Sequence, residues 1–353
     1  MGRDVKFSNF LFPESRSRAD DGRIIDETLA EARLSDELGF DVIWLAEHHF
    51  DGICAYVDPV TFAAALSVAT SRAGIGFAVA QMALHHPTRF AEQMALIDHL
   101  SNGRLIVGLG RGTAYNIYDY QGFGIDPAEA QARFEEAEAF MIKAWQGGPV
   151  EHNGRYFNLK LPELRPAPRT RPHPRIIRAA SSEHGMIGIA RTGRPFMMNV
   201  QSDAVIANRM DLYRQTLRET GLGEDEITRL AGECWIWRNV VVAETDAEAE
   251  RIAVPAFKAM IEFRAAMRDR VTREQGRSLA RPGKPGEAPA ARTTLEHGVV
   301  FGSPQTVARK LAPIAETGVG GLIIQFRLGP MSFSDTARSL ELFQKAVVPA
   351  LDA

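Results

Sequence analysis

Cysteine is scarce in this chain of 353 residues, which has only Cys54 and Cys234. Two cysteines far apart in the sequence cannot form the set of bridges that holds small secreted domains together. They also exclude a metal site built mainly from thiolates. Stability must come from a conventional core, and the 45% hydrophobic content excludes disorder as the main state.

Long apolar runs are also absent. The longest stays under ten residues, whereas a helix that spans a membrane needs about 20. The first residues, MGRDVKFSNFLF, show no cleavable signal pattern and lead directly into a strand-like segment. We therefore expect a cytoplasmic protein with no membrane partner.

Neither sign of charge is in excess. Forty-one basic and forty-four acidic side chains give a formal net charge of -3. Nucleic acids and anionic membranes both favour proteins with a basic excess, so the balance argues against either as the main partner.

Short β-branched or aromatic runs alternate with longer segments of helical periodicity. Strands are predicted at residues 5–12, 41–46, 74–81, 104–109, 175–180, 195–200, 234–243 and 321–327. Helices are predicted at residues 22–38, 59–72, 89–100, 128–145, 183–192, 204–220, 247–270, 304–317 and 335–347. Strands that are apolar throughout indicate a parallel sheet covered on both faces. Eight such units favour an α/β fold, a single (β/α)8 TIM barrel over residues 1–353, with a doubly wound open sheet as the alternative.

Two segments interrupt this alternation. The first, about residues 147–174, follows the fourth barrel helix and carries Asn153-Gly154 between apolar residues, which predicts a β-hairpin with a two-residue turn and then a proline-rich tether. The second, about residues 272–297, follows the seventh strand and is rich in glycine and proline. A loop of this length indicates either a functional lid over the site or a disordered insertion.

Barrel enzymes build their active sites at the C-terminal ends of the strands. His48 follows the second strand and is a candidate general acid or base, or a hydrogen-bonded, partly buried histidine. Ser181 and Ser182 open a helix, where they form either a phosphate site completed by Arg111 or an ordinary N-cap. The glycine-rich run 108–112 lacks the third glycine of a dinucleotide fingerprint.

Histidines at positions 48, 49, 85 and 86 raise the question of a metal. The pattern lacks the carboxylates expected at other strand ends, so we expect no metal site, with a metal hydrolase as a minor alternative. The apolar residues near strand ends suggest either a partly hydrophobic pocket or barrel core; they are Phe12, Phe50, Phe196, Met197, Trp235 and Trp237.

Several segments resemble the bacterial luciferase family of flavin-dependent monooxygenases. They are KFSNFLF at 6–12, LGFDVIWLAEHHF at 38–50, HPTRFAEQMALIDHLSNGRLIVGLGRG at 86–112 and GSPQTVARKLAPIAETGVGGLIIQF at 302–326. The resemblance covers nearly the whole chain, apart from residues 272–297.

The resemblance implies a barrel that binds FMN at its C-terminal mouth. Reduced FMN, supplied by a separate flavin reductase, would react with O2 to form a C4a-(hydro)peroxyflavin that oxygenates a small organic substrate. By position, His48 matches the family's catalytic histidine and Glu47 its neighbouring carboxylate. Ala78 and Val79 match a bulge with a non-proline cis peptide that supports the flavin ring. The phosphate-binding positions are matched by Arg111, Ser181, Ser182 and Gly185.

The sequence also departs from the luciferases. Gly110 replaces a reactive cysteine, which we expect to open space beside the flavin, and Ser181 replaces a glutamate. A luciferase-like monooxygenase is therefore expected, and not a light-emitting enzyme. The helices at 59–72 and 89–100 correspond to the family's dimer interface, which implies a homodimer. An oxidoreductase that uses the deazaflavin F420 for hydride transfer and a non-catalytic flavin-binding subunit stay as alternatives.

Overall fold

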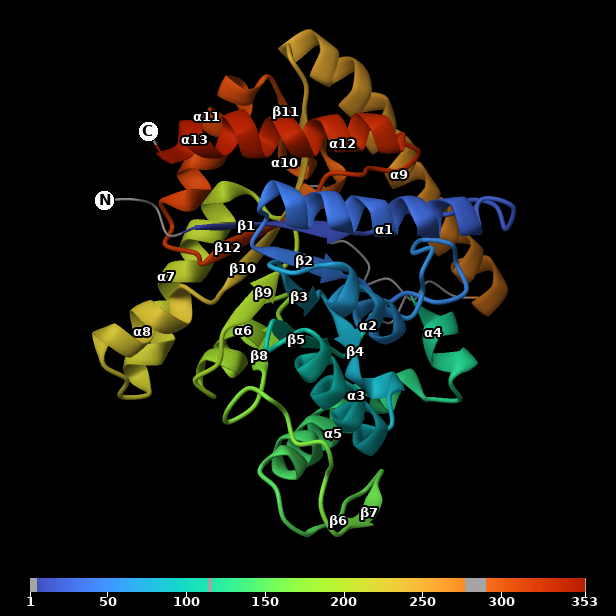
Figure 1. Ribbon diagram of the computed structural model, residues 1–353, viewed down its shortest axis with the longest axis vertical. Coiled ribbons are helices and arrows are strands. Elements are labelled where there is room, and N and C mark those ends of the chain that lie inside the picture. The colour runs from blue at the N-terminus through green and yellow to red at the C-terminus, as the bar shows by residue number, and fades with distance from the viewer. Residues whose placement is uncertain (1–4, 114–115, 277–289, 353) are drawn as a thin grey trace.

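Eight parallel strands close into a barrel in the computed structural model, which describes residues 5–113, 116–276 and 290–352 (Figure 1). Around the ring they are β1 (Lys6–Leu11), β2 (Val42–Leu45), β3 (Gly74–Phe77), β5 (Leu105–Gly110), β8 (Arg175–Ala179), β9 (Phe196–Met198), β10 (Trp235–Val242) and β12 (Gly321–Gln325). β9 pairs with β10, which closes the ring and leaves it with no open edge. The predicted barrel is confirmed, and the open sheet is wrong because it would leave two edge strands unpaired.

Helices cover the outside of the barrel (Figure 1). The longer ones are α1 (Asp21–Leu38), α2 (Pro59–Ala69), α3 (Pro87–Leu100), α5 (Ala130–Trp145), α6 (Glu183–Ala190), α7 (Asp203–Glu219), α9 (Asp246–Gln275), α11 (Pro304–Ala315) and α12 (Phe333–Leu342). Shorter ones are α4 (Ile117–Gly122), α8 (Glu224–Ala231), α10 (Leu295–Gly298) and α13 (Val348–Asp352), which a π-helical turn at Phe343–Val347 joins to α12. Three 3-10 turns lie at Met82–Leu84, Pro127–Glu129 and Ala291–Thr293. None of the described helices is long and apolar enough to cross a membrane.

Two tryptophans fill the middle of the barrel. Trp44 of β2 and Trp235 of β10 meet edge to face with their ring centroids 5.0 Å apart, although β1 and β12 lie between their strands in the sheet. Glycines make room for both rings, because a Cβ on Gly76 would overlap the indole of Trp44 and one on Gly321 would overlap that of Trp235. The middle of the barrel is therefore a packed core and not a pore.

Some element boundaries differ from the prediction. The third strand stops at Phe77 and resumes as β4 (Ala80–Gln81), and a short β11 (Val300–Gly302), which was not predicted, pairs with the end of β10. The helices α4, α8 and α10 were also missed. α9 runs to Gln275, beyond its predicted end at 270, because Gly276, with φ +67°, is the residue that ends it. Half of the predicted lid, residues 277–289, lies outside the described residues.

The predicted hairpin is confirmed, but its turn is not the two-residue turn expected at Asn153-Gly154. Asn153 of β6 (Val150–Asn153) pairs with Asn158 of β7 (Asn158–Leu161), which leaves a four-residue loop, 154–157. The carboxylate of Glu136 on α5 determines this loop, since it accepts the backbone N–H groups of residues 155, 156 and 157 over 2.8–3.2 Å. A contact distant in sequence thus overrides the local turn preference.

Replacing Glu136 by alanine should release this loop. We expect Glu136→Ala to lower the free energy of unfolding by about 1–3 kcal/mol, because three backbone N–H groups, two of them partly buried, lose their acceptor. The amides of residues 155–157 should also exchange hydrogen faster. Glu135→Ala, on the exposed face of the same helix, is the control and should change the unfolding free energy by less than about 0.5 kcal/mol. Unchanged exchange of the loop amides in Glu136→Ala would contradict this explanation.

Candidate active site

A mainly apolar pocket lies at the C-terminal ends of the barrel strands. Phe12 follows β1, His48 follows β2 and Trp237 lies on β10, and all three line the pocket. The C-terminal half of α9 forms another wall, with Met260, Ile261, Arg264, Met267, Arg268 and Val271. Of the apolar residues predicted near the strand ends, Phe12, Phe50 and Trp237 line the pocket, whereas Phe196, Met197 and Trp235 are buried in the core. The pocket interpretation is therefore correct for the first three residues, and the core interpretation is correct for the other three.

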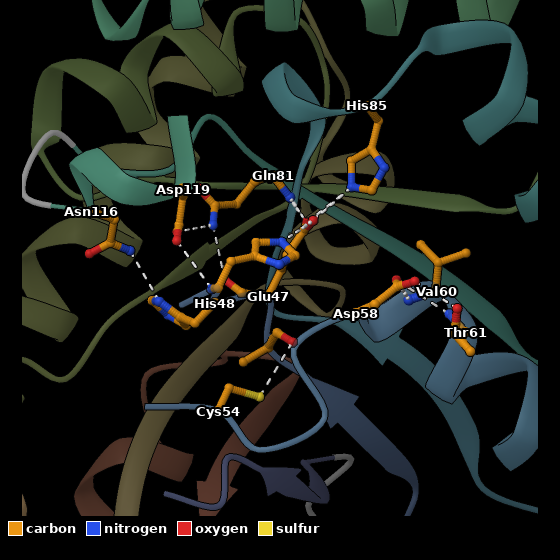
Figure 2. A network of polar contacts seen from close by, with 12 residues as sticks. Glu47, His48, Cys54, Asp58, Val60, Thr61, Gln81, His85, Asn116 and Asp119 are labelled. Atoms are coloured by element: carbon orange, nitrogen blue, oxygen red, sulfur yellow. Dashed lines mark hydrogen bonds and ion pairs between the residues drawn. The ribbon is translucent and has the colours of Figure 1, made fainter. Parts of the chain in front are cut away.

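His48 is held on the pocket wall from two sides. Its ring stacks on Phe12 with centroids 5.1 Å apart. On another side, the amide nitrogen of Asn116 lies 3.0 Å from its Nδ1 (Figure 2). Burial lowers the pKa of His48 to about 4, and the positive charges of Arg264 and His49 act in the same direction. The ring is therefore neutral at pH 7. Because Asn116 donates to Nδ1, the proton of the neutral ring is on Nε2, which makes Nε2 a hydrogen-bond donor.

The carboxylate of Glu47 is buried behind the pocket. Its oxygens lie 3.2 Å from Nε2 of His49 and 2.9 Å from Nε2 of His85, and the N–H of Gln81 donates to it over 2.5 Å (Figure 2). Burial would raise the pKa of Glu47, but the charge of His85 and these hydrogen bonds outweigh it and lower the pKa to about 2. Burial would likewise lower the pKa of His85, yet the charge of Glu47 raises it. Glu47 therefore joins the ends of the second and third strands as half of a buried ion pair.

Asp119 connects the same strand ends to α4. Its carboxylate accepts the N–H of His49 over 3.1 Å and the side-chain amide of Gln81 over 2.8 Å. Burial raises the pKa of Asp119 to about 6. Asn116 directly precedes this helix, so Asp119 also fixes the residue that contacts His48. Sequence reasoning missed both, because α4 has only six residues and shows too little periodicity to be recognised.

The peptide bond between Ala78 and Val79 is cis, as the resemblance implies. It lies at the break between β3 and β4, beside the end of β5. Gly110 is buried there, and a Cβ on it would lie 2.6 Å from Cγ2 of Val79. The expectation that Gly110 opens space beside the flavin is therefore wrong, because the Val79 side chain fills the volume that a larger residue would need.

The residues assigned to phosphate lie at two adjacent strand ends. β5 pairs with β8 in a register that aligns Leu109 with Arg178, so Arg111 and Ser181 follow neighbouring strands. Arg111, Ser181 and Ser182 are exposed, and Gly185 is partly buried. The Ser182 hydroxyl accepts the N–H of Gly185 over 3.2 Å and caps α6, so the N-cap interpretation is correct for this serine. None of these four residues lines the pocket around His48.

The histidines near the pocket are held by protein groups. His49 and His85 both contact Glu47. Within the part of the chain that the structure describes, no group of three His, Cys, Asp or Glu residues is placed to hold a metal ion.

Residues 5–321 match the family model described as luciferase-like monooxygenase, so the chain belongs to this family. Limonene 1,2-monooxygenase of Rhodococcus erythropolis is 34% identical over 164 residues, which are 46% of this chain and 42% of that protein. The alkanal monooxygenase alpha chain of Photorhabdus luminescens is 27% identical over 219 residues, 62% of this chain and 60% of that one. The matches thus span less than two thirds of these relatives.

Solved structures of the same fold cover nearly the whole chain. Monooxygenase RslO1 from Streptomyces bottropensis has a TM-score of 0.80 and 26% identity, over 98% of this chain and 99% of that chain. The oxygenating constituent of 3,6-diketocamphane monooxygenase from Pseudomonas putida, in complex with FMN, has a TM-score of 0.78 and 21% identity, over 98% of both chains. An F420-dependent secondary alcohol dehydrogenase has a TM-score of 0.74 and 18% identity, over 99% of both. The last two likenesses show the shared fold alone.

The ion pair of Glu47 predicts a specific dependence of stability on pH. Its carboxylate stabilises the fold fully above the ordinary pKa of about 4.3, and this contribution is lost as the pH falls toward about 2. The protonated ring of His85 stabilises the fold fully below its ordinary pKa of about 6.5. This contribution is lost as the pH rises through the raised pKa of His85.

Glu47→Gln should therefore lower the unfolding free energy by about 1–3 kcal/mol, with the largest difference from the parent between about pH 4.5 and 6.5. Urea unfolding at a series of pH values measures this difference. Glu92→Gln, which removes a partly exposed carboxylate of α3 whose pairing with Arg89 is a long surface contact of 3.8 Å, is the control. A difference that does not vary with pH would contradict the ion pair.

The contact between Val79 and Gly110 predicts a second effect. Gly110→Ala should lower the unfolding free energy by about 1–3 kcal/mol, because the added methyl group overlaps Val79 in a packed region. Val79→Ala combined with Gly110→Ala should recover much of this loss, which a double-mutant cycle measures. If Gly110→Ala is as stable as the parent, the space beside Gly110 is open after all.

Proposed function

We propose that this chain is a flavin-dependent monooxygenase that uses reduced FMN and O2 to oxygenate a small, partly hydrophobic organic substrate. The observation that carries the proposal is the environment of His48, a neutral hydrogen-bond donor on the wall of an apolar pocket at the catalytic end of a luciferase-like barrel. The names of limonene 1,2-monooxygenase and of the FMN-bound 3,6-diketocamphane monooxygenase component support the same class.

The residues next to the pocket fit FMN. Arg111 is an exposed cation, and the first turn of α6 is exposed at the neighbouring strand end, an arrangement suited to a phosphate. We assign the phosphate to Arg111, Ser181, Ser182 and Gly185, and the ring to Ala78, Val79 and Gly110, with Glu47 supporting His48. When bound, the reduced flavin supplies the electrons that activate O2.

The protein's own contribution is to place a hydrogen-bond donor and to exclude water. His48 would donate a hydrogen bond from Nε2 to the oxygen atom that is being transferred, while Asn116 holds Nδ1 and so fixes the ring. Phe12, Trp237 and Met267 would keep water from the reacting groups.

The proposed partners follow from the same assignment. A separate flavin reductase would supply reduced FMN, and the protein would work in the cytoplasm. A homodimer would use α2 and α3, where Val68, Leu96 and Leu100 are exposed. The alternative activity is hydride transfer with F420, which the likeness to an F420-dependent alcohol dehydrogenase supports at the level of the fold. Fluorescence titration with FMN and with F420 separates the two, and oxygen consumption with reduced FMN separates an enzyme from a non-catalytic subunit.

His48→Ala should bind FMN as the parent does but lose product formation by about a hundredfold or more, the usual contribution of a positioned hydrogen-bond donor. The assay supplies reduced FMN, O2 and a panel of aldehydes, ketones, amines and thioethers, and detects products by mass spectrometry. His99→Ala, on the exposed side of α3, is the control. Parent-like turnover in His48→Ala would contradict the role of His48, and absence of any oxygenated product from the parent would contradict the proposed function.

A further inference from the structure

The wall that α9 contributes to the pocket carries positive charge on an otherwise apolar face. The lining residues at positions 260, 261, 264, 267, 268 and 271 recur with the spacing of one helix face. Met260, Ile261, Met267 and Val271 suit an apolar pocket. Arginines at 264 and 268 break this pattern and need an explanation.

Arg264 has an explanation within the protein. Its Nε lies 3.3 Å from the buried carboxylate of Glu14, and its guanidinium lies 4.8 Å from the centroid of the Phe12 ring. Arg270, which also lines the pocket, pairs with Glu274 over 2.9 Å. Both cations are therefore compensated by acidic residues of this chain.

Arg268 is different. It is partly buried, and no hydrogen bond or ion pair is formed with it by residues 5–113, 116–276 or 290–352. Arg292, which also lines the pocket, is exposed and likewise has no such partner in this part of the chain. For the partly buried Arg268, withdrawal from water without a counter-charge costs free energy, which a bound anion would offset.

The acidic residues of the lining do not provide that counter-charge. Asp51 accepts the N–H of Ile53 over 2.9 Å, and burial raises its pKa. Asp119 accepts the backbone N–H of His49 and the side-chain amide of Gln81, as described above. Among the described residues, the pocket therefore combines apolar walls with two arginines, Arg268 and Arg292, that have no counter-charge.

We propose that the substrate is an apolar molecule that carries a carboxylate or a similar anionic group, which Arg268 binds with Arg292 as a second cation. The apolar body would lie against Phe12, Trp237 and Met267, beside His48. This inference rests on the proposed function and deepens it by naming the substrate class. The flavin phosphate is the other anion to consider, but the residues assigned to it, Arg111 and Ser181 among them, lie outside this pocket.

The test compares two probes of the same shape and different charge, 2-naphthoate and 2-acetonaphthone. Calorimetric titration of the full chain, without flavin, should give an affinity for 2-naphthoate at least about tenfold higher than that for 2-acetonaphthone. This is the difference expected for a charge-assisted hydrogen bond. Arg268→Met should remove this preference and leave the affinity for 2-acetonaphthone within about twofold. Arg268→Lys keeps the positive charge and should retain part of the preference for 2-naphthoate. This variant tests the inference even if Arg268→Met does not fold. Arg273→Met, exposed on the same helix outside the lining, is the matched control.

Equal affinities for the two probes, or an equal loss of both in Arg268→Met, would overturn the inference. So would a tenfold loss of affinity for FMN but not for riboflavin in Arg268→Met, because it would assign the arginine to the flavin phosphate. Since binding is measured without flavin or O2, an intact preference for 2-naphthoate without any oxygenation would count against the proposed function alone. Oxygenation of neutral substrates with no preference for the anion would count against this inference alone.

Discussion

The buried carboxylate of Glu47 is the interaction on which the catalytic end of this barrel depends. It binds His49 of its own segment and both His85 and the N–H of Gln81 beyond the third strand. A carboxylate in this position stays ionised only because its partners outweigh the cost of burial. Gln81 extends the network to Asp119 on α4, and the residue before that helix holds His48 (Figure 2). One charge thus connects two strand ends and a helix, and the orientation of His48 follows from that connection.

The site divides into two regions with different chemistry. Around His48, aromatic residues and α9 form an apolar pocket in which burial keeps the imidazole neutral. At the adjacent strand ends, Val79 packs directly on Gly110, and Arg111 and the start of α6 are exposed. The first region suits an organic substrate and the second a flavin with its phosphate, which is the division of labour that we propose for this member of the luciferase-like family. The arginines on α9 add charge selectivity to the first region.

The regular part of the fold was predictable from the sequence, because eight apolar runs separated by helical segments admit few arrangements. What the sequence did not predict depends on contacts between distant residues. The hairpin loop follows the carboxylate of Glu136 and not the Asn-Gly preference, and the volume beside Gly110 is filled by Val79 from the break between β3 and β4. His48 could be singled out at a strand end, whereas Asn116 could not, because nothing in its local sequence indicates that it reaches a histidine 68 positions earlier. Helix periodicity alone likewise could not predict that Arg268 lines a pocket.

The central claim is that His48 is a neutral hydrogen-bond donor in the working protein, kept neutral by burial and oriented by Asn116. A 15N NMR titration of the histidine rings in the parent and in His48→Ala, which identifies the signal of His48, tests it most directly. The account predicts that His48 stays neutral down to a pKa of about 4, with its proton on Nε2. A titration near the ordinary value of about 6.5, or a proton on Nδ1, would contradict it.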